Sequence, residues 1–245
     1  MPRSVHSAAV VACWLSLLSL AQAKDPASVE WQPLFDGRTL EGWEQHSGEA
    51  KYTVEDECIV GTSVPRTGNS FLCTKKTYSD FVFECEFKVD PVLNSGIQFR
   101  SQFFAEETEI PLGDGKTKKI PADRVFGYQS EIDVEPKRAR MWSAGIYDEA
   151  RRNWLYPGSR GGNDEEFSTQ GRKITNVEGW NKVRIECVGD SIKTFLNGEP
   201  RADFQDDLTP AGIIALQVHG VGNDESKVGK QVRWRNIRIK DLSGE

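Results

Sequence analysis

The segment from Phe126 to Val134 alternates side chains with the two-residue period of a β-strand. One face is mostly apolar (Tyr128, Ser130, Ile132 and Val134), and the other carries an amide and two carboxylates (Gln129, Glu131 and Asp133). A strand that only had to stay soluble would more often show a mixture of Lys, Thr and Glu on its polar face. The segment therefore predicts a strand with one face in a core and one polar face available for chemistry.

Two further segments show the same division. In the segment 94–100, Ile97 and Phe99 face one way, and the polar side chains of Asn94, Gln98 and Arg100 face the other. In the segment 213–219, Ile214, Leu216 and Val218 oppose Gln217 and His219. If the three strands share a sheet, their polar faces form a groove lined by Arg, Gln, Glu and His.

The remaining pattern predicts about a dozen short strands, at the spacing of an all-β protein. Asn197-Gly198 is a strong hairpin signal between two of them. Another strand is expected over residues 139–147, and residues 102–125 and 148–170 are expected to be long loops. No long amphipathic helix or internal repeat is evident. We therefore expect an antiparallel two-sheet β-sandwich of the jelly-roll type with long rim loops.

The N-terminus has the features of a secretory signal peptide. Arg3 supplies a positive charge, residues 8–20 are apolar, and Ala21-Gln22-Ala23 is a cleavage motif of small residues. No later segment is apolar enough to span a bilayer. We expect residues 1–23 to be removed and residues 24–245 to form one domain, located in the periplasm or secreted.

Composition narrows the class of ligand. The formal net charge of the 245-residue chain is −6, and removal of Arg3 makes it one unit more negative, so nucleic acid is not an expected partner. Neutral ligands such as sugars fit better. The four cysteines after residue 23 form no CxxC pair and have no zinc spacing, so no zinc site is expected. No cofactor is expected either, and no calcium-ligand spacing supports a site at Asp148 and Glu149, so a metal requirement stays open. Whether the four cysteines form disulfides or buried thiols stays open.

Glu131 is the first candidate catalytic residue, because a carboxylate in a cleft beside Gln129 and Asp133 can serve as a general base. His219, at the end of its strand, suits proton transfer or sugar binding. Arg100 could stabilise an oxyanion or pair with Glu131. Each has a structural alternative: an exposed strand carboxylate, a histidine bonded to a backbone carbonyl, and a structural salt bridge.

Candidate substrate-binding residues are mostly neutral. Amide side chains hydrogen-bond sugar hydroxyls without adding charge, and they recur on all three polar faces at Gln98, Gln129 and Gln217. The alternative is a buried polar ladder between strands. Tyr147 and Trp154 could stack on a sugar ring.

Several motifs together resemble the bacterial 3-keto-disaccharide (3-keto-glycoside) hydrolase domain. They are FDGRTLEGW, NSGIQFRS, GYQSEIDV, SAGIYDE, WNKVRIECVGDSIKTFLNG, GIIALQVHG and VRWRNIRIKDL, in that order between Trp31 and Leu242. The resemblance implies a concanavalin A-like jelly roll, in agreement with the strand pattern. It also implies cleavage of glycosides that a separate oxidoreductase has first oxidised at C3.

In that chemistry the ketone acidifies the C2 proton, a base removes it, the aglycone leaves from C1, and water adds to the enone. The resemblance suggests Glu131 and His219 as base and acid in either order, and Arg100 as the enolate stabiliser. The residues expected to hold the substrate are Gln98, Gln129, Gln217, Tyr147, Asn94, Asp133 and Trp154. Four alternatives stay open: a non-catalytic carbohydrate-binding module, a structural or adhesion domain, an isomerase, and a lyase that stops at the enone.

Overall fold

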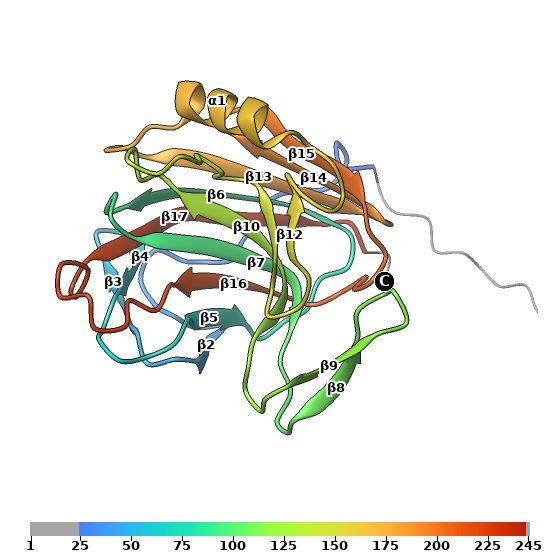
Figure 1. The fold of residues 1–245 in the computed structure, drawn as a ribbon, viewed down its shortest axis with the longest axis horizontal. Coiled ribbons are helices and arrows are strands. Elements are labelled where there is room, and N and C mark those ends of the chain that lie inside the picture. The colour runs from blue at the N-terminus through green and yellow to red at the C-terminus, as the bar shows by residue number, and fades with distance from the viewer. Residues whose placement is uncertain (1–24, 244–245) are drawn as a thin grey trace, which may run out of the picture.

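The computed structural model describes residues 25–243, which form two antiparallel β-sheets packed face to face (Figure 1). The expected signal peptide, residues 1–23, lies outside the described residues. The all-β sandwich expected from the strand pattern is confirmed. In the described part of the chain, no helix is long and apolar enough to cross a membrane.

The first sheet has the strand order β15 (Glu199–Gln205), β14 (Ser191–Leu196), β13 (Asn181–Val188), β6 (Phe81–Val89), β17 (Gln231–Asp241), β4 (Cys58–Thr62) and β3 (Lys51–Glu55), with β1 (Gln32–Pro33) also paired to β17. The second sheet has the order β12 (Asn153–Tyr156), β11 (Ile146–Glu149), β10 (Phe126–Asp133), β7 (Asn94–Gln102), β16 (Ile213–Val218), β5 (Ser70–Thr74) and β2 (Trp43–Ser47). The three strands with predicted polar faces, β10, β7 and β16, are therefore neighbours.

The main core lies between the two sheets because alternate residues of each strand point inward. From the first sheet, Phe83 and Phe87 of β6 are fully buried. From the second, Tyr128 and Ile132 of β10 belong to the same core cluster. The predicted alternation of β10 is confirmed, and the side chains of Gln129 and Glu131 are left on the opposite, outer face of the second sheet.

Strand β7 contains a bulge that the sequence pattern did not reveal. Its pairing with β16 passes from Ser101↔Ile213 to Gln98↔Ala215, and its pairing with β10 passes from Gln102↔Phe126 to Phe99↔Tyr128. On both sides β7 has one residue more than its partner, and Arg100 at the bulge has φ +44°. The alternation of side chains is broken at this point, so the face predicted for Arg100 is wrong.

Two segments expected to be loops contain regular structure. Residues 102–125 include a hairpin of β8 (Thr108–Pro111) and β9 (Thr117–Ile120), which projects from the second sheet (Figure 1). Residues 148–170 include β12 and the beginning of helix α1 (Asp164–Ile174). The strand expected over 139–147 is present only from Ile146 onward, as β11.

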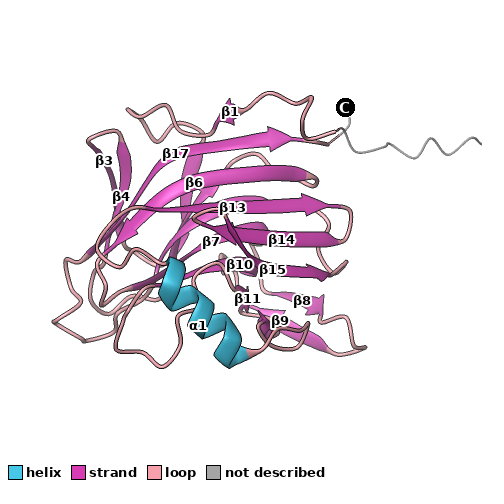
Figure 2. Ribbon diagram, turned by 90° about the horizontal axis from the view of Figure 1, so that it is seen from above, coloured by secondary structure: helices cyan, strands magenta, loops and turns pink. Residues whose placement is uncertain are grey.

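The end strands of the two sheets, β12 and β15, are linked by stacked rings of Tyr156 and Phe204, with centroids 6.0 Å apart. Figure 2 shows helix α1 past β15, at the end of the row formed by β6, β13, β14 and β15. Phe167 of the helix packs against Tyr156 of β12, with ring centroids 6.0 Å apart. The guanidinium of Arg201 in β15 lies 3.4 Å from the centre of the Phe167 ring. The helix thus closes one side of the sandwich.

The four cysteines of the described chain, Cys58, Cys73, Cys85 and Cys187, are free and buried. This settles the question that the sequence left open, in favour of buried thiols. Burial raises the pKa of the Cys187 thiol to about 12, so it is protonated and unreactive at neutral pH.

Candidate active site

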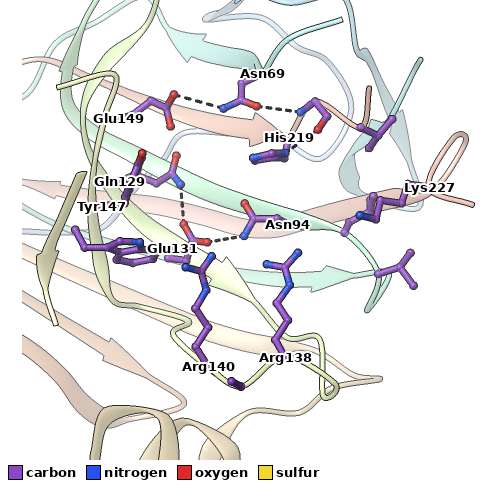
Figure 3. A pocket seen from close by; sticks show the side chains of 16 residues that line it. Asn69, Asn94, Gln129, Glu131, Arg138, Arg140, Tyr147, Glu149, His219 and Lys227 are labelled. Atoms are coloured by element: carbon purple, nitrogen blue, oxygen red, sulfur yellow. Dashed lines mark hydrogen bonds between the residues drawn. The ribbon is translucent and has the colours of Figure 1, made fainter. Parts of the chain in front are cut away.

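A cleft of about 840 Å³ opens on the outer face of the second sheet. Its floor comes from the sheet, with Asn94 from β7, Gln129 and Glu131 from β10, Tyr147 and Glu149 from β11, and Trp154 from β12. Loops supply its walls, with Asn69, Arg138, Arg140, His219 and Lys227 (Figure 3). Six of the ten residues predicted from the sequence lie here: Asn94, Gln129, Glu131, Tyr147, Trp154 and His219.

Glu131 is 3 % exposed and lies at the floor of the cleft. One carboxylate oxygen accepts a hydrogen bond from Asn94 Nδ2, and the other accepts one from Gln129 Nε2 at 2.8 Å. Burial raises the pKa of Glu131 to about 7, with a further contribution from the nearby Asp133 charge, although both amides favour the ionised form. Glu131 can therefore gain or lose a proton near neutral pH.

The amide beside Glu131 is oriented by a chain of hydrogen bonds in the sheet. Gln98 Nε2 donates to Gln129 Oε1 at 2.6 Å, so the Nε2 of Gln129 is left to face Glu131. Ser101 Oγ donates to Gln98 Oε1 at 2.8 Å. Gly96 provides the space for this arrangement, because a Cβ there would lie 2.4 Å from Gln129 Cδ. Gln98 is fully buried and does not line the cleft, so its predicted place at the substrate is wrong.

His219 stands in the wall of the cleft with its ring exposed (Figure 3). Its Nδ1 lies 2.8 Å from the carbonyl oxygen of Gly220. A carbonyl only accepts, so Nδ1 carries the proton in the neutral ring and the lone pair is on Nε2. The surrounding protein lowers the pKa of His219 by desolvation, and the charges of Arg138, Lys227 and Arg124 lower it further.

Two arginines border the cleft near Glu131, and both are held by Asp133. Asp133 is fully buried, and its Oδ2 accepts from Arg138 Nη1 at 3.2 Å and from Arg140 Nε at 3.1 Å. In Figure 3 the two guanidinium groups lie side by side and point toward Glu131 and Asn94. Asp133 itself does not line the cleft. Asp133 therefore holds the two arginines in place and is not positioned for the predicted contact with substrate.

Glu149 is the second carboxylate of the cleft. It accepts hydrogen bonds from Arg124 Nη2 and, at 3.4 Å, from Asn69 Nδ2. Asn69 Oδ1 in turn accepts from the backbone N–H of Gly220 at 3.0 Å, which ties Glu149 to the loop that carries His219 (Figure 3). Burial raises the pKa of Glu149.

An aromatic pair, Tyr147 and Trp154, forms part of the cleft lining. The rings of Tyr147 and Trp154 meet edge to face, with centroids 5.1 Å apart. The guanidinium of Arg140 lies 4.9 Å from the centre of the Trp154 ring and 5.3 Å from that of Trp142. These contacts hold Arg140 in one orientation.

Arg100 lies away from the cleft. Its side chain is 1 % exposed, and its Nε and Nη1 donate at 2.8 Å to the carbonyls of Ser79 and Gly189. Its Nη2 donates to Asp80 at 3.0 Å. Because Ser79, Asp80 and Gly189 adjoin strands of the first sheet, Arg100 joins the two sheets and has the structural role that the sequence left as an alternative.

Gln217 also lies outside the cleft lining. It is fully buried on the outer face of β16, between Gly96 of β7 and Phe71 of β5. Within residues 25–243, neither its Nε2 nor its Oε1 has a hydrogen-bond partner. Its predicted position in an open groove is therefore wrong.

Within residues 25–243, no group of three or more His, Cys, Asp or Glu side chains is arranged to hold a metal ion. The groups available for chemistry in the cleft are acids, bases, amides and guanidinium groups. Such a set can move protons and stabilise a developing negative charge.

Sequence reasoning missed five polar residues that line the cleft: Asn69, Arg138, Arg140, Glu149 and Lys227. All but Glu149 lie in loops, where no periodicity indicates which way a side chain points. Glu149 could have been found, because it lies two residues after Tyr147 and therefore faces the same side of β11.

Comparison with known proteins agrees with this description. The family model of the 3-keto-alpha-glucoside-1,2-lyase-like domain matches residues 30–240. No curated protein matches the chain in sequence.

Several solved structures are similar in fold. A candidate glycosyl hydrolase from Parabacteroides distasonis superposes with a TM-score of 0.55 and 21% identity, over 89% of this chain and 95% of its own. A Bacillus subtilis protein of unknown function with a galectin-like fold gives 0.54 and 10%, over 88% and 96%. Porphyranase B from Zobellia galactanivorans gives 0.51 and 11%, over 91% and 98%. At these identities the similarity establishes the jelly-roll fold alone.

Proposed function

Because the chain belongs to the family of 3-keto-alpha-glucoside-1,2-lyase-like domains, we propose that it cleaves the glycosidic bond of sugars carrying a ketone at C3. The observation that carries the proposal is a buried carboxyl group with a pKa of about 7 in the same cleft as a histidine whose Nε2 is free to exchange a proton. Two such groups are what an elimination followed by hydration requires.

The reaction runs in two halves. In the first, a base removes the proton on C2, the electron pair forms an enolate with the C3 oxygen, and the C1–O bond to the aglycone breaks as its oxygen is protonated. The product is an enone with a C1=C2 double bond. In the second half, water adds to C1, loses a proton to the enzyme, and C2 regains one. A lyase stops after the first half, whereas a hydrolase completes both.

Glu131 is the proposed base at C2. Asn94 and Gln129 donate to its two oxygens and thereby favour the ionised form that a base requires. His219 is the proposed second group. In its imidazolium form it protonates the departing oxygen through Nε2, and the neutral ring that results then takes a proton from water. After one cycle Glu131 and His219 return to their starting protonation states, so the sequence of transfers is balanced.

Arg140 takes the role that the sequence gave to Arg100, stabilisation of the enolate. Its positive charge lies near enough to Glu131 to lower the pKa of that carboxyl. Asp133 and the Trp142 and Trp154 rings hold it in place before substrate arrives. Preorganised cations of this kind typically contribute about 10²–10³-fold to a rate.

The second candidate function is a carbohydrate-binding module. The pair of Tyr147 and Trp154 in the cleft favours it, because aromatic rings stack on the apolar faces of sugars. Binding alone would have no use for a buried carboxyl group with a raised pKa, so the enzyme is the better proposal.

A separate oxidoreductase must supply the ketone, because the elimination depends on an acidified C2 proton. The signal-peptide features of residues 1–23 support action in the periplasm or outside the cell.

The test is to incubate residues 24–245 with matched aryl glucosides and aryl 3-keto-glucosides and to follow release of the aryl alcohol. We expect release from the keto substrate only, and a loss of about 10²–10⁴-fold when Glu131→Gln removes the base. Release from the unoxidised glucoside would contradict the elimination. Sugar binding by calorimetry without release from either substrate would favour the binding module.

A further inference from the structure

The walls of the cleft concentrate positive charge in an acidic protein. The chain has 37 Asp and Glu against 31 Lys and Arg, yet all three charged residues that loops bring to the cleft, Arg138, Arg140 and Lys227, are cations. The two carboxylates of the cleft, Glu131 and Glu149, come from the strands of the floor. In Figure 3, Arg138 and Lys227 lie on the His219 side of Glu131.

Arg138 is held in place on one side only. Its Nε donates to Glu135 at 2.8 Å and its Nη1 to the buried Asp133 at 3.2 Å. Within residues 25–243, its Nη2 makes no hydrogen bond, and the guanidinium points into the cleft (Figure 3). An arginine fixed by a buried carboxylate, with free N–H donors facing a cavity, is the usual arrangement for binding a carboxylate, sulfate or phosphate.

Lys227 comes from the loop that joins β16 to β17 and reaches the same side of the cleft. Its Nζ lies 3.2 Å from Asp224 Oδ2, and its side chain is 32 % exposed. The charges of Arg138 and Lys227 both act on the His219 ring, where each lowers its pKa. An anionic group on this side of the cleft would meet two cationic side chains of its lining, Arg138 and Lys227.

We infer that Arg138 and Lys227 bind an anionic group of the substrate, so that the favoured substrates are acidic 3-keto-glycosides. The inference rests on the proposed function for the position of the sugar and adds the chemical class of its substituent. Arg138 offers a fork of donors and Lys227 a point charge, so a carboxylate, sulfate or phosphate is bound in place of a neutral hydroxyl.

The test compares aryl 3-keto-glucosides with two anionic partners: the corresponding 3-keto-glucuronide, and a 3-keto-glucoside with a carboxylate on the aryl group. The measured quantity is kcat/KM for the better anionic substrate divided by kcat/KM for the neutral one. We expect a ratio of about 10 or more, falling about tenfold in Arg138→Gln and in Lys227→Gln. Added salt should also lower it. A larger ratio for the 3-keto-glucuronide would place the bound charge on the sugar, and a larger ratio for the aryl carboxylate would place it on the aglycone.

Lys137→Gln is the matched control. Lys137 is an exposed cation beside Arg138 that does not line the cleft, so its loss should leave the ratio unchanged. A ratio near 1 in the unaltered protein, or an equal fall in all three variants, would overturn the inference while the proposed function stands. If no keto substrate is cleaved, the proposed function fails. In that case binding tests the inference. The dissociation constant of the unoxidised glucoside divided by that of the glucuronide should fall in Arg138→Gln and Lys227→Gln but not in Lys137→Gln.

Discussion

At the scale of single residues, the protonation of Glu131 depends on an amide chain that begins outside the cleft. Gln98 fixes the direction of Gln129, and Gln129 therefore presents a donor to Glu131. A donor stabilises the carboxylate, whereas a flipped amide would present an oxygen and favour the carboxylic acid. Gln98 thus acts as a positioning residue through Gln129.

The pH dependence of kcat/KM should report the protonation of Glu131. The pKa of Glu131 is about 7, and desolvation lowers the pKa of His219. We expect a bell-shaped kcat/KM, because the reactive pair, an ionised Glu131 with a protonated His219, holds one proton. The alkaline limb should lie near pH 7. Gln98→Leu frees Gln129 to flip, so this limb should move to higher pH by about half a unit or more.

The same substitution at Gln102, which is in β7 but outside the amide chain, is the control. A merely structural role for Gln98 would lower the amount of folded protein without moving the alkaline limb. That outcome would show that Gln98 does not orient Gln129.

The sequence predicts the position of Glu131 because strand periodicity alone determines the face on which it lies. The same reasoning fails for Arg100, three residues after Ile97 on an apparently regular strand. A bulge adds one residue to β7 and reverses the face of the residues that follow, and no glycine or proline at 99–101 indicates this. Loop residues such as Arg138 have no periodicity at all.

At the scale of elements, the bulge in β7 turns Arg100 into a connection between the two sheets. Its guanidinium donates to two backbone carbonyls and to Asp80 while almost completely buried. Removing such a group leaves buried acceptors unsatisfied. Arg100→Met should therefore lower the free energy of unfolding by about 3–5 kcal/mol in urea titrations.

Arg235→Met tests whether loss of any arginine has this effect. Arg235 is 39 % exposed and pairs with Glu86 at 2.8 Å, so its loss should cost less than about 1 kcal/mol. The folded Arg100 variant should retain activity within about twofold. A selective loss of activity at unchanged stability would return Arg100 to the catalytic role suggested by the family resemblance.

Helix α1 carries sequence signals at both of its ends that strand alternation does not indicate. Asn163 accepts from the backbone N–H groups of Glu165 and Glu166, and acidic residues occupy the first turn. Basic residues occupy the last turn. These are ordinary helix-boundary signals, but the helix has only 11 residues, and Phe167 and Ile174 are its only large apolar side chains, so too few apolar positions mark it in the sequence.

At the scale of the whole molecule, the sandwich could be predicted because nearly every strand alternates apolar and polar side chains. The family motifs, in their order along the chain, imply the same fold. The polar cleft follows only in part. Its floor lies on strands, so it could be predicted, but its charged walls come from segments far apart in the chain. Arg138 and Lys227 lie on one side of it because the loops after β10 and β16 leave the sheet at the same end (Figure 1).

Burial of Glu131 should lower the free energy of unfolding of the protein by an amount that depends on pH. Its pKa is about 7 in the folded protein and near 4.5 when unfolded, so between these values the folded state binds more protons. Stability contributed by this group is therefore full below pH 4.5 and falls as the pH rises to 7. Unfolding of the unaltered protein and of Glu131→Gln should be measured in urea at pH 5 and pH 8.

The substituted side chain does not titrate. The free energy of unfolding of Glu131→Gln minus that of the unaltered protein should therefore rise by on the order of 2–3 kcal/mol from pH 5 to pH 8. His219 and Glu149 titrate in both proteins, and their effects cancel in the difference. A difference that is the same at pH 5 and pH 8 would mean that Glu131 has an ordinary pKa. It would then be a weak base at C2, and the catalytic role proposed for it would lose its physical support.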